Sequence, residues 1–74
     1  MRVLEIHSLD DVKYLIRAER KRQGLLQWEL AEKACVSDRT VSTAETGRFM
    51  PHLEVLLDIF RALGYDEVHF KLRK

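Results

Sequence analysis

The sequence predicts a mainly α-helical domain of four to five short helices with a short C-terminal β-strand. Over most of its length, apolar residues recur three and four positions apart, which is the spacing of one buried helix face. Gly24 and Gly64 each follow such a periodic segment, where a left-handed residue commonly ends a helix. Residues 67–73 instead alternate between apolar and polar side chains, as a half-buried strand does.

The composition indicates one small domain, residues 1–74. Seventy-four residues bury little apolar surface, so the core alone should be marginally stable without a partner surface. No apolar run approaches the ~20 residues that span a bilayer, and the N-terminal residues lack the apolar segment of a signal peptide. The single cysteine excludes an internal disulfide and suits a reducing compartment, so we expect a cytoplasmic protein with no membrane partner.

The first elements predicted are a short strand at Val3–Ile6 and a helix that begins after Ser8. Ser8 is a good N-cap, and the two aspartates that follow place negative charge at the positive end of the helix dipole. The helix should end near Gln23, with Gly24 as its left-handed terminator. Its buried stripe is predicted to consist of Leu9, Val12, Leu15 and Ile16.

Residues 27–47 predict two short helices joined by a tight turn. Val36 lies in the turn, and Ser37 is placed to cap the second helix. The inward-facing residues are Leu30, Ala31 and Ala34 on the first helix, and Val41, Ala44 and Glu45 on the second. This arrangement is the helix-turn-helix, whose second helix lies in the major groove when such a motif binds DNA.

The outward face of the second helix suits contact with base edges. Placing Val41 inward turns Arg39, Thr43 and Thr46 outward, with Ser42 on the flank. Apart from Asp38 and Arg39 at its start, this face carries only short hydroxyl side chains. The alternative interpretation is an ordinary polar solvent face.

The charge distribution also favours the helix-turn-helix segment as the part of the chain that binds DNA. The net charge is only +1, but eight basic and five acidic residues between Lys13 and Arg48 leave +3 there. Residues 1–12 carry −2, and residues 49–74 carry 0. The positive excess therefore coincides with the helix-turn-helix, and a dimer would double it along one face of DNA.

The last helix is predicted from about His52 or Leu53 to Leu63. The residues expected to face the core are Leu53, Leu56, Leu57 and Phe60. A second apolar stripe of Val55, Ile59 and Ala62 should lie on the opposite side, and a helix that is apolar on both sides is buried on both sides. In so small a protein, a second copy of the chain is the expected cover.

The C-terminal segment supports a dimer. Val68, Phe70 and Leu72 should point to one side of a strand over residues 67–73. A lone strand or a two-stranded ribbon is marginal in water, so pairing across a two-fold axis would complete the sheet. The alternative is a hairpin with Val3–Ile6 and no dimer, although the two arrangements are compatible.

Several motifs at fixed spacing resemble the lambda-repressor-like helix-turn-helix of the XRE class. The coverage runs from about Leu9 to Gly64, and the C-terminal strand makes the chain most similar to HipB-type antitoxins. The resemblance implies a prokaryotic or phage protein. The motifs are Ile16-Arg17-x3-Lys21-x2-Gly24-Leu25, Gln27-x-Glu29-Leu30-Ala31, Val36-Ser37, Val41-Ser42, Glu45-x-Gly47-Arg48, Pro51, and Leu53-x2-Leu56-Leu57-x2-Phe60-x-Ala62-Leu63-Gly64.

The resemblance implies roles for individual residues. It pairs Arg20 with Glu45 so that the first helix is tied to the reading helix; the alternative is that Arg20 faces phosphate. We assign base readout to Asp38, Arg39 and Thr43, since an arginine fork matches guanine and a threonine methyl can touch thymine. Asp38 is expected either to accept from a cytosine amino group or to orient Arg39. The phosphate contacts are assigned to Gln27, Ser37, Thr40, Ser42 and Arg48.

Three residues depart from the family pattern. Leu26 stands where a capping residue is usual, so the start of the helix and a phosphate contact are in doubt. Cys35 stands at a left-handed turn position that usually holds glycine, and we expect a buried, inert thiol rather than a redox switch or metal ligand. Trp28 is expected to pack on a flank or a partner. The three histidines show no zinc spacing, so no metal or cofactor is expected.

The sequence therefore predicts a DNA-binding transcriptional repressor that acts as a homodimer on a near-palindromic operator. The leading hypothesis is an autorepressing antitoxin that also binds a cognate toxin protein. The alternatives are a stand-alone regulator of the phage-repressor or restriction-controller type, and an interaction adaptor that has lost DNA binding. An enzyme is not expected, because no general base is placed beside the serines or the cysteine and there is no phosphate-binding glycine loop.

Overall fold

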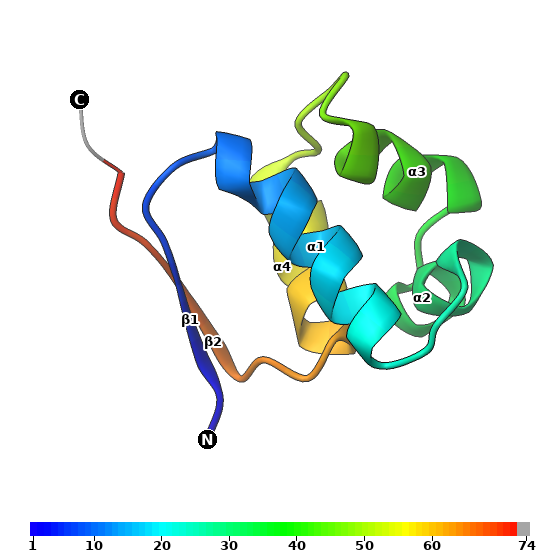
Figure 1. Ribbon diagram of the computed structural model, residues 1–74, viewed down its shortest axis with the longest axis horizontal. Coiled ribbons are helices and arrows are strands. Elements are labelled where there is room, and N and C mark those ends of the chain that lie inside the picture. The colour runs from blue at the N-terminus through cyan, green and yellow to red at the C-terminus, as the bar shows by residue number, and fades with distance from the viewer. Residues whose placement is uncertain (73–74) are drawn as a thin grey trace.

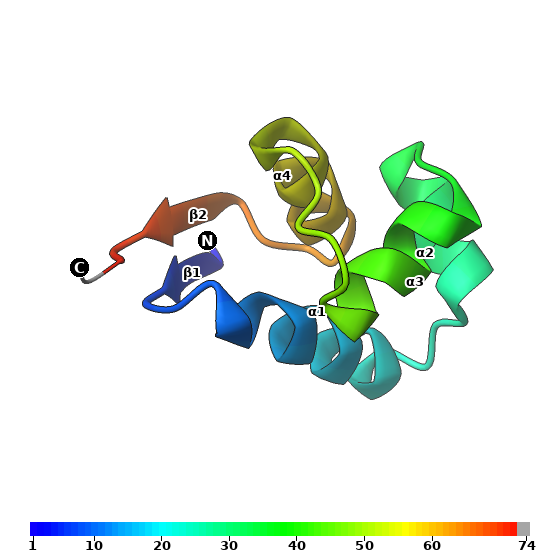
Figure 2. The ribbon, with the colours of Figure 1, turned by 90° about the horizontal axis from the view of Figure 1, so that it is seen from above.

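A computed structural model describes residues 1–72 of the chain. Its elements are β1 (Val3–Ile6), α1 (Asp10–Arg22), α2 (Gln27–Ala34), α3 (Asp38–Thr46), α4 (Leu53–Ala62) and β2 (Glu67–Phe70). Both views place the strands at one end of the molecule and α2 with α3 at the other, with α1 and α4 between them (Figures 1 and 2). The mainly α-helical fold class is confirmed. None of the helices in the described part is long and apolar enough to cross a membrane.

The two strands pair in parallel within one chain. Leu4 lies opposite Val68 and Ile6 opposite Phe70. Because parallel strands need a crossover connection, the four helices form the link between them. The alternative pairing with Val3–Ile6 is therefore present, but as a parallel pair and not as a hairpin. The strand predicted over residues 67–73 ends at Phe70, Leu72 lies beyond it and is about half exposed, and Arg73 lies outside the described residues.

One apolar core joins all four helices to the sheet. Ile6 anchors β1 in it, and the ring of Phe60 meets the edge of Tyr65 with centroids 6.2 Å apart. The buried apolar residues are Ile6, Val12, Ile16, Leu30, Ala31, Ala34, Val41, Ala44, Leu56, Ile59, Phe60 and Leu63.

Three expectations about packing were wrong. Leu9 precedes the first turn of α1 and is exposed, and Leu53, the first residue of α4, is also exposed rather than in the core. Ile59, predicted at a dimer surface, is fully buried inside a single chain. The reason is that α4 packs against α2 as well as against β2, so elements of the same chain bury Ile59.

Local hydrogen bonds explain where the helices begin. The Ser37 hydroxyl accepts from the Thr40 N–H at 3.1 Å, as an N-cap does. The Ser8 hydroxyl accepts from the Asp10 N–H at 3.2 Å, although the N-cap position of α1 is Leu9, which has no capping side chain. Leu26 cannot cap α2, but the Glu29 carboxylate accepts from the Leu26 N–H at 2.8 Å. This is one half of a capping box, and it gives α2 a defined start.

A polar cluster joins the N-terminal end of β1 to the C-terminal ends of α1 and α4. The Glu19 carboxylate accepts hydrogen bonds from Arg22, from Arg2 at 2.8 Å and from Gln23 at 3.0 Å. Gln23 also donates to the Leu63 carbonyl at 2.6 Å. These donors, led by Arg22, hold the pKa of Glu19 far below its ordinary value of 4.5.

We predict that Glu19 makes stability depend on acid pH. A carboxylate with a depressed folded-state pKa contributes stability that is fully present above the unfolded-state pKa and is lost as pH falls through the folded-state pKa. The free energy of unfolding should therefore decline below about pH 4.5, and Glu19→Gln should show a smaller decline. Urea denaturation between pH 6 and pH 2 (roughly the window in which carboxylates titrate) measures this. Equal slopes for both proteins would contradict the assignment.

Candidate nucleic-acid interface

The third helix exposes one polar face and buries the opposite one. Val41 and Ala44 are buried against the core, whereas Arg39 and Thr46 are exposed and Thr43 is half-buried. This is the orientation predicted from the sequence. A short, largely hydroxyl-lined helix face with an arginine at its start is therefore open to a large partner.

A buried ion pair holds this helix against α1. The Arg20 Nε donates to Glu45 Oε2 at 2.6 Å and Nη2 donates to Oε1 at 2.9 Å, in the two-bond geometry that an arginine fork favours. Arg20 also donates to the Leu25 carbonyl at 2.7 Å and is only 8% exposed. The hydrogen bonds from Arg20 to Glu45 raise the pKa of this guanidinium. The pair implied by the family resemblance is present.

The turn before α3 is sharply defined. Cys35 adopts a left-handed backbone with φ of 59°, as its position predicted. Its side chain is exposed, however, so the expected burial of the thiol was wrong: the turn carries it on the outside of the α2–α3 corner. In the described part of the chain, no three or more His, Cys, Asp or Glu side chains cluster in a way that could hold a metal ion.

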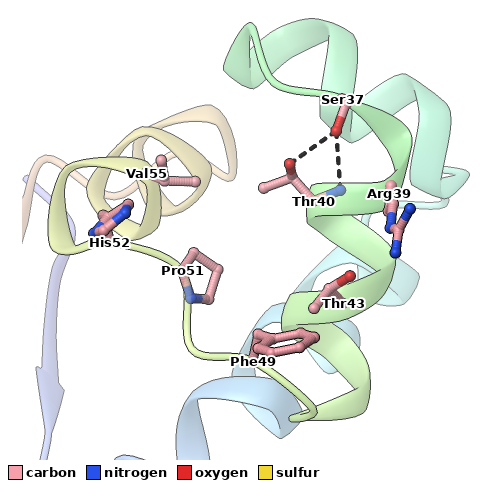
Figure 3. A pocket seen from close by; sticks show the side chains of 8 residues that line it. All are labelled: Ser37, Arg39, Thr40, Thr43, Phe49, Pro51, His52 and Val55. Carbon is pink, nitrogen blue, oxygen red and sulfur yellow. Dashed lines mark hydrogen bonds between the residues drawn. The ribbon is translucent and has the colours of Figure 1, made fainter.

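A hollow of about 290 Å³ separates α3 from the start of α4 (Figure 3). A second hollow of about 350 Å³ lies along the exposed face of α3. Neither lining includes a carboxylate. The first is lined by Ser37, Arg39, Thr40, Thr43, Phe49, Pro51, His52 and Val55, and the second by Arg39, Ser42, Thr43, Thr46, Arg48 and Phe49.

Most of the residues assigned to DNA contact therefore lie on one surface. At the N-terminal end of α3, the hydroxyls of Ser37 and Thr40 lie 2.8 Å apart and hydrogen-bond to each other. Arg39, Ser42, Thr43 and Arg48 line the same surface, and all of these side chains come from α3 or the residues just before and after it. Asp38 is exposed at the start of α3, and within residues 1–72 no hydrogen bond or ion pair joins it to Arg39.

Gln27, which was also assigned to DNA contact, has its side chain directed elsewhere. Its amide donates to Glu45 Oε1 at 3.4 Å, so it lies beside the buried ion pair. Gln27 is also the first residue of α2, where a backbone N–H has no acceptor within the helix. The side chain thus supports the reading helix, and only the backbone remains suited to an anion.

Sequence reasoning did not assign Phe49, Pro51 or His52 to the site. They belong to the connection between α3 and α4, which the helical periodicity does not describe. Phe49 is 70% exposed in the structure, and the only signal in the sequence was a bulky aromatic residue directly after Arg48.

Residues 16–70 match the helix-turn-helix family HTH_3. The chain belongs to this family. The match includes the second half of α1, all of α2, α3 and α4, and β2. A protein of Methanothermobacter thermautotrophicus named an uncharacterized HTH-type transcriptional regulator is 42% identical over 57 residues, which cover 77% of this chain and 83% of that protein.

Proposed function

We propose that this helix-turn-helix chain is a sequence-specific transcriptional repressor that binds double-stranded DNA. The observation that carries the proposal is the orientation of α3, whose polar face is turned outward while its inner face is anchored through Glu45. Membership of the helix-turn-helix family and the similarity to a transcriptional regulator support it. The absence of carboxylates from both hollows beside α3 suits an anionic partner.

In this proposal, the exposed face of α3 reads base edges in the major groove. Arg39 donates to O6 and N7 of a guanine, since its planar fork matches that pair of acceptors. Thr43 touches a thymine methyl group, and Asp38 accepts from a cytosine amino group. The exposed position of Arg39 at the start of α3 supports its role, because the N-terminal residues of a recognition helix contact base edges.

Phosphate contacts fix the position of the helix without reading sequence. Ser42 and Arg48 flank the reading face along its length, and Ser37 with Thr40 lies at its N-terminal end. Gln27 contributes through its backbone N–H at the start of α2. Hydroxyl groups, arginines and helix N-termini are the usual donors to phosphate oxygens.

The proposed active form is a homodimer on a near-palindromic operator. Each chain has one reading helix, so two copies would place a pair of them in successive major grooves about 34 Å apart. A two-stranded sheet has two open edges and is marginal alone, which favours pairing with a second copy. With Ile59 buried, the proposed surface is made by the exposed parts of Val55, Ala62, Val68, Phe70 and Leu72.

The finer assignment is an autorepressing antitoxin that also binds a cognate toxin. The strand that follows α4 favours the antitoxin assignment, because this strand is the feature that makes the chain resemble HipB-type antitoxins. A stand-alone regulator is the second candidate, favoured by the finding that β2 pairs within its own chain. Co-purification with the product of a neighbouring gene distinguishes the two, and an adaptor without DNA binding would show no salt-dependent affinity for duplexes.

Two arginine variants test the readout. Arg39→Ala should weaken binding to the operator by about 1–3 kcal/mol and relax the preference at one base pair. Arg48→Ala should weaken binding to all duplexes alike and lower the salt dependence by about one phosphate contact. Titrations of both variants against operator and random duplexes at several salt concentrations measure these effects. An unchanged operator affinity for Arg39→Ala would refute its assignment.

Light scattering tests the dimer. The wild-type chain should have the mass of two copies. Val68→Lys places a charge in the proposed surface and should favour the monomer. It should also weaken operator binding, because the monomer cannot contact the second half-site. Exposed Lys33→Glu on α2 serves as a control for charge alone. A wild-type monomer at the concentrations used for DNA titration would contradict the dimer proposal.

A further inference from the structure

Phe49 is the most exposed aromatic side chain among residues 1–72. It is 70% exposed, compared with 65% for Tyr14 and 51% for Trp28. It lies two residues after Gly47, whose left-handed backbone with φ of 75° ends α3. Leaving a phenyl ring in water forgoes a large burial free energy, so an exposed ring beside a binding surface is a candidate contact.

The ring lies between the base-reading and phosphate-binding parts of the surface. Phe49 lines both hollows, together with Arg39 and Thr43 in each, and Arg48 joins it in the second. Figure 3 shows the ring beside Thr43, and both side chains line the same hollow as Arg39. A duplex that meets Arg39 with its base edges and Arg48 with its backbone must therefore also meet Phe49.

The charges around Phe49 select the kind of partner. Two arginines and a histidine line the hollows, and no acidic side chain does. This suits a polyanion and disfavours a second copy of the chain, which would bring the same positive charges against each other.

We propose that Phe49 is a specificity-determining residue that packs against the 5-methyl group of a thymine in the major groove. This rests on the proposed function. A phenyl ring has no hydrogen-bond donor or acceptor, and the thymine methyl is the apolar group that the major groove presents. Phe49 therefore distinguishes thymine from cytosine at a base pair next to those that Arg39 and Thr43 read.

The test replaces single methyl groups in the DNA. The preferred site is first selected from a randomised duplex pool with the wild-type protein, and each thymine of that site is then replaced by deoxyuridine. At the thymine that contacts Phe49, which is distinct from the thymine that Thr43 touches, the wild-type affinity should fall about fourfold, the effect of one buried methyl group. With Phe49→Ala, the affinities for thymine and deoxyuridine at that position should be equal.

Two variants control the interpretation. Phe49→Leu keeps an apolar side chain and should still prefer thymine. Tyr14→Ala removes an aromatic ring of similar exposure from α1 and should keep the full fourfold preference. Because Phe49 is exposed, Phe49→Ala should unfold thermally at the wild-type temperature.

The outcomes separate this inference from the proposed function. If no site is enriched, the proposed function itself fails. If a site is enriched but the wild-type protein ignores every deoxyuridine, or Phe49→Ala keeps every preference, the inference is overturned. A loss of affinity in Phe49→Ala that is equal for all duplexes would place the ring on the sugar–phosphate backbone, and a shift to monomer would place it at a dimer contact. Both results reject thymine readout.

Discussion

The ion pair between Arg20 and Glu45 is the interaction on which the rest of the structure depends. It joins α1 to α3 through two hydrogen bonds of 2.6 and 2.9 Å, and a third bond fixes the loop at Leu25. Both side chains are largely removed from solvent, so losing one partner would leave a buried charge unpaired, at a cost of about 3–5 kcal/mol. Because Glu45 lies on the inner face of α3, the same pair determines which face points outward.

The sheet, at the other end of the molecule, stabilises the fold by enlarging the core. A chain of this size has little core, and the sheet extends it through Ile6 of β1 and the packing of β2 against α4. Glu19 and its three donors then fasten the N-terminal end of β1 to the ends of α1 and α4. These contacts form a framework with polar interactions at both ends, and the outer face of α3 stays exposed.

The sequence was sufficient for features that depend on local chemistry. Helical periodicity, caps and the left-handed turn at Cys35 located all four helices, and the family motif located the Arg20–Glu45 pair. The sequence was insufficient where packing between distant segments decides which surfaces are buried and how the strands pair. Periodicity marked a second apolar side of α4 but cannot show whether the same chain or another copy covers it, so Ile59 was misplaced. The parallel direction of the strands and the exposure of Phe49 likewise follow from the three-dimensional path of the chain.

Native-state hydrogen exchange of Arg20→Met tests the central claim, that this pair anchors α3. The variant keeps an apolar stem but leaves Glu45 without its partner. In the variant, amides of α3 should exchange faster than those of α4, whereas both helices are protected in the wild type. Arg61→Met, which alters an exposed pair of 4.0 Å, should leave both unchanged. Equal protection of α3 and α4 in Arg20→Met would contradict the account.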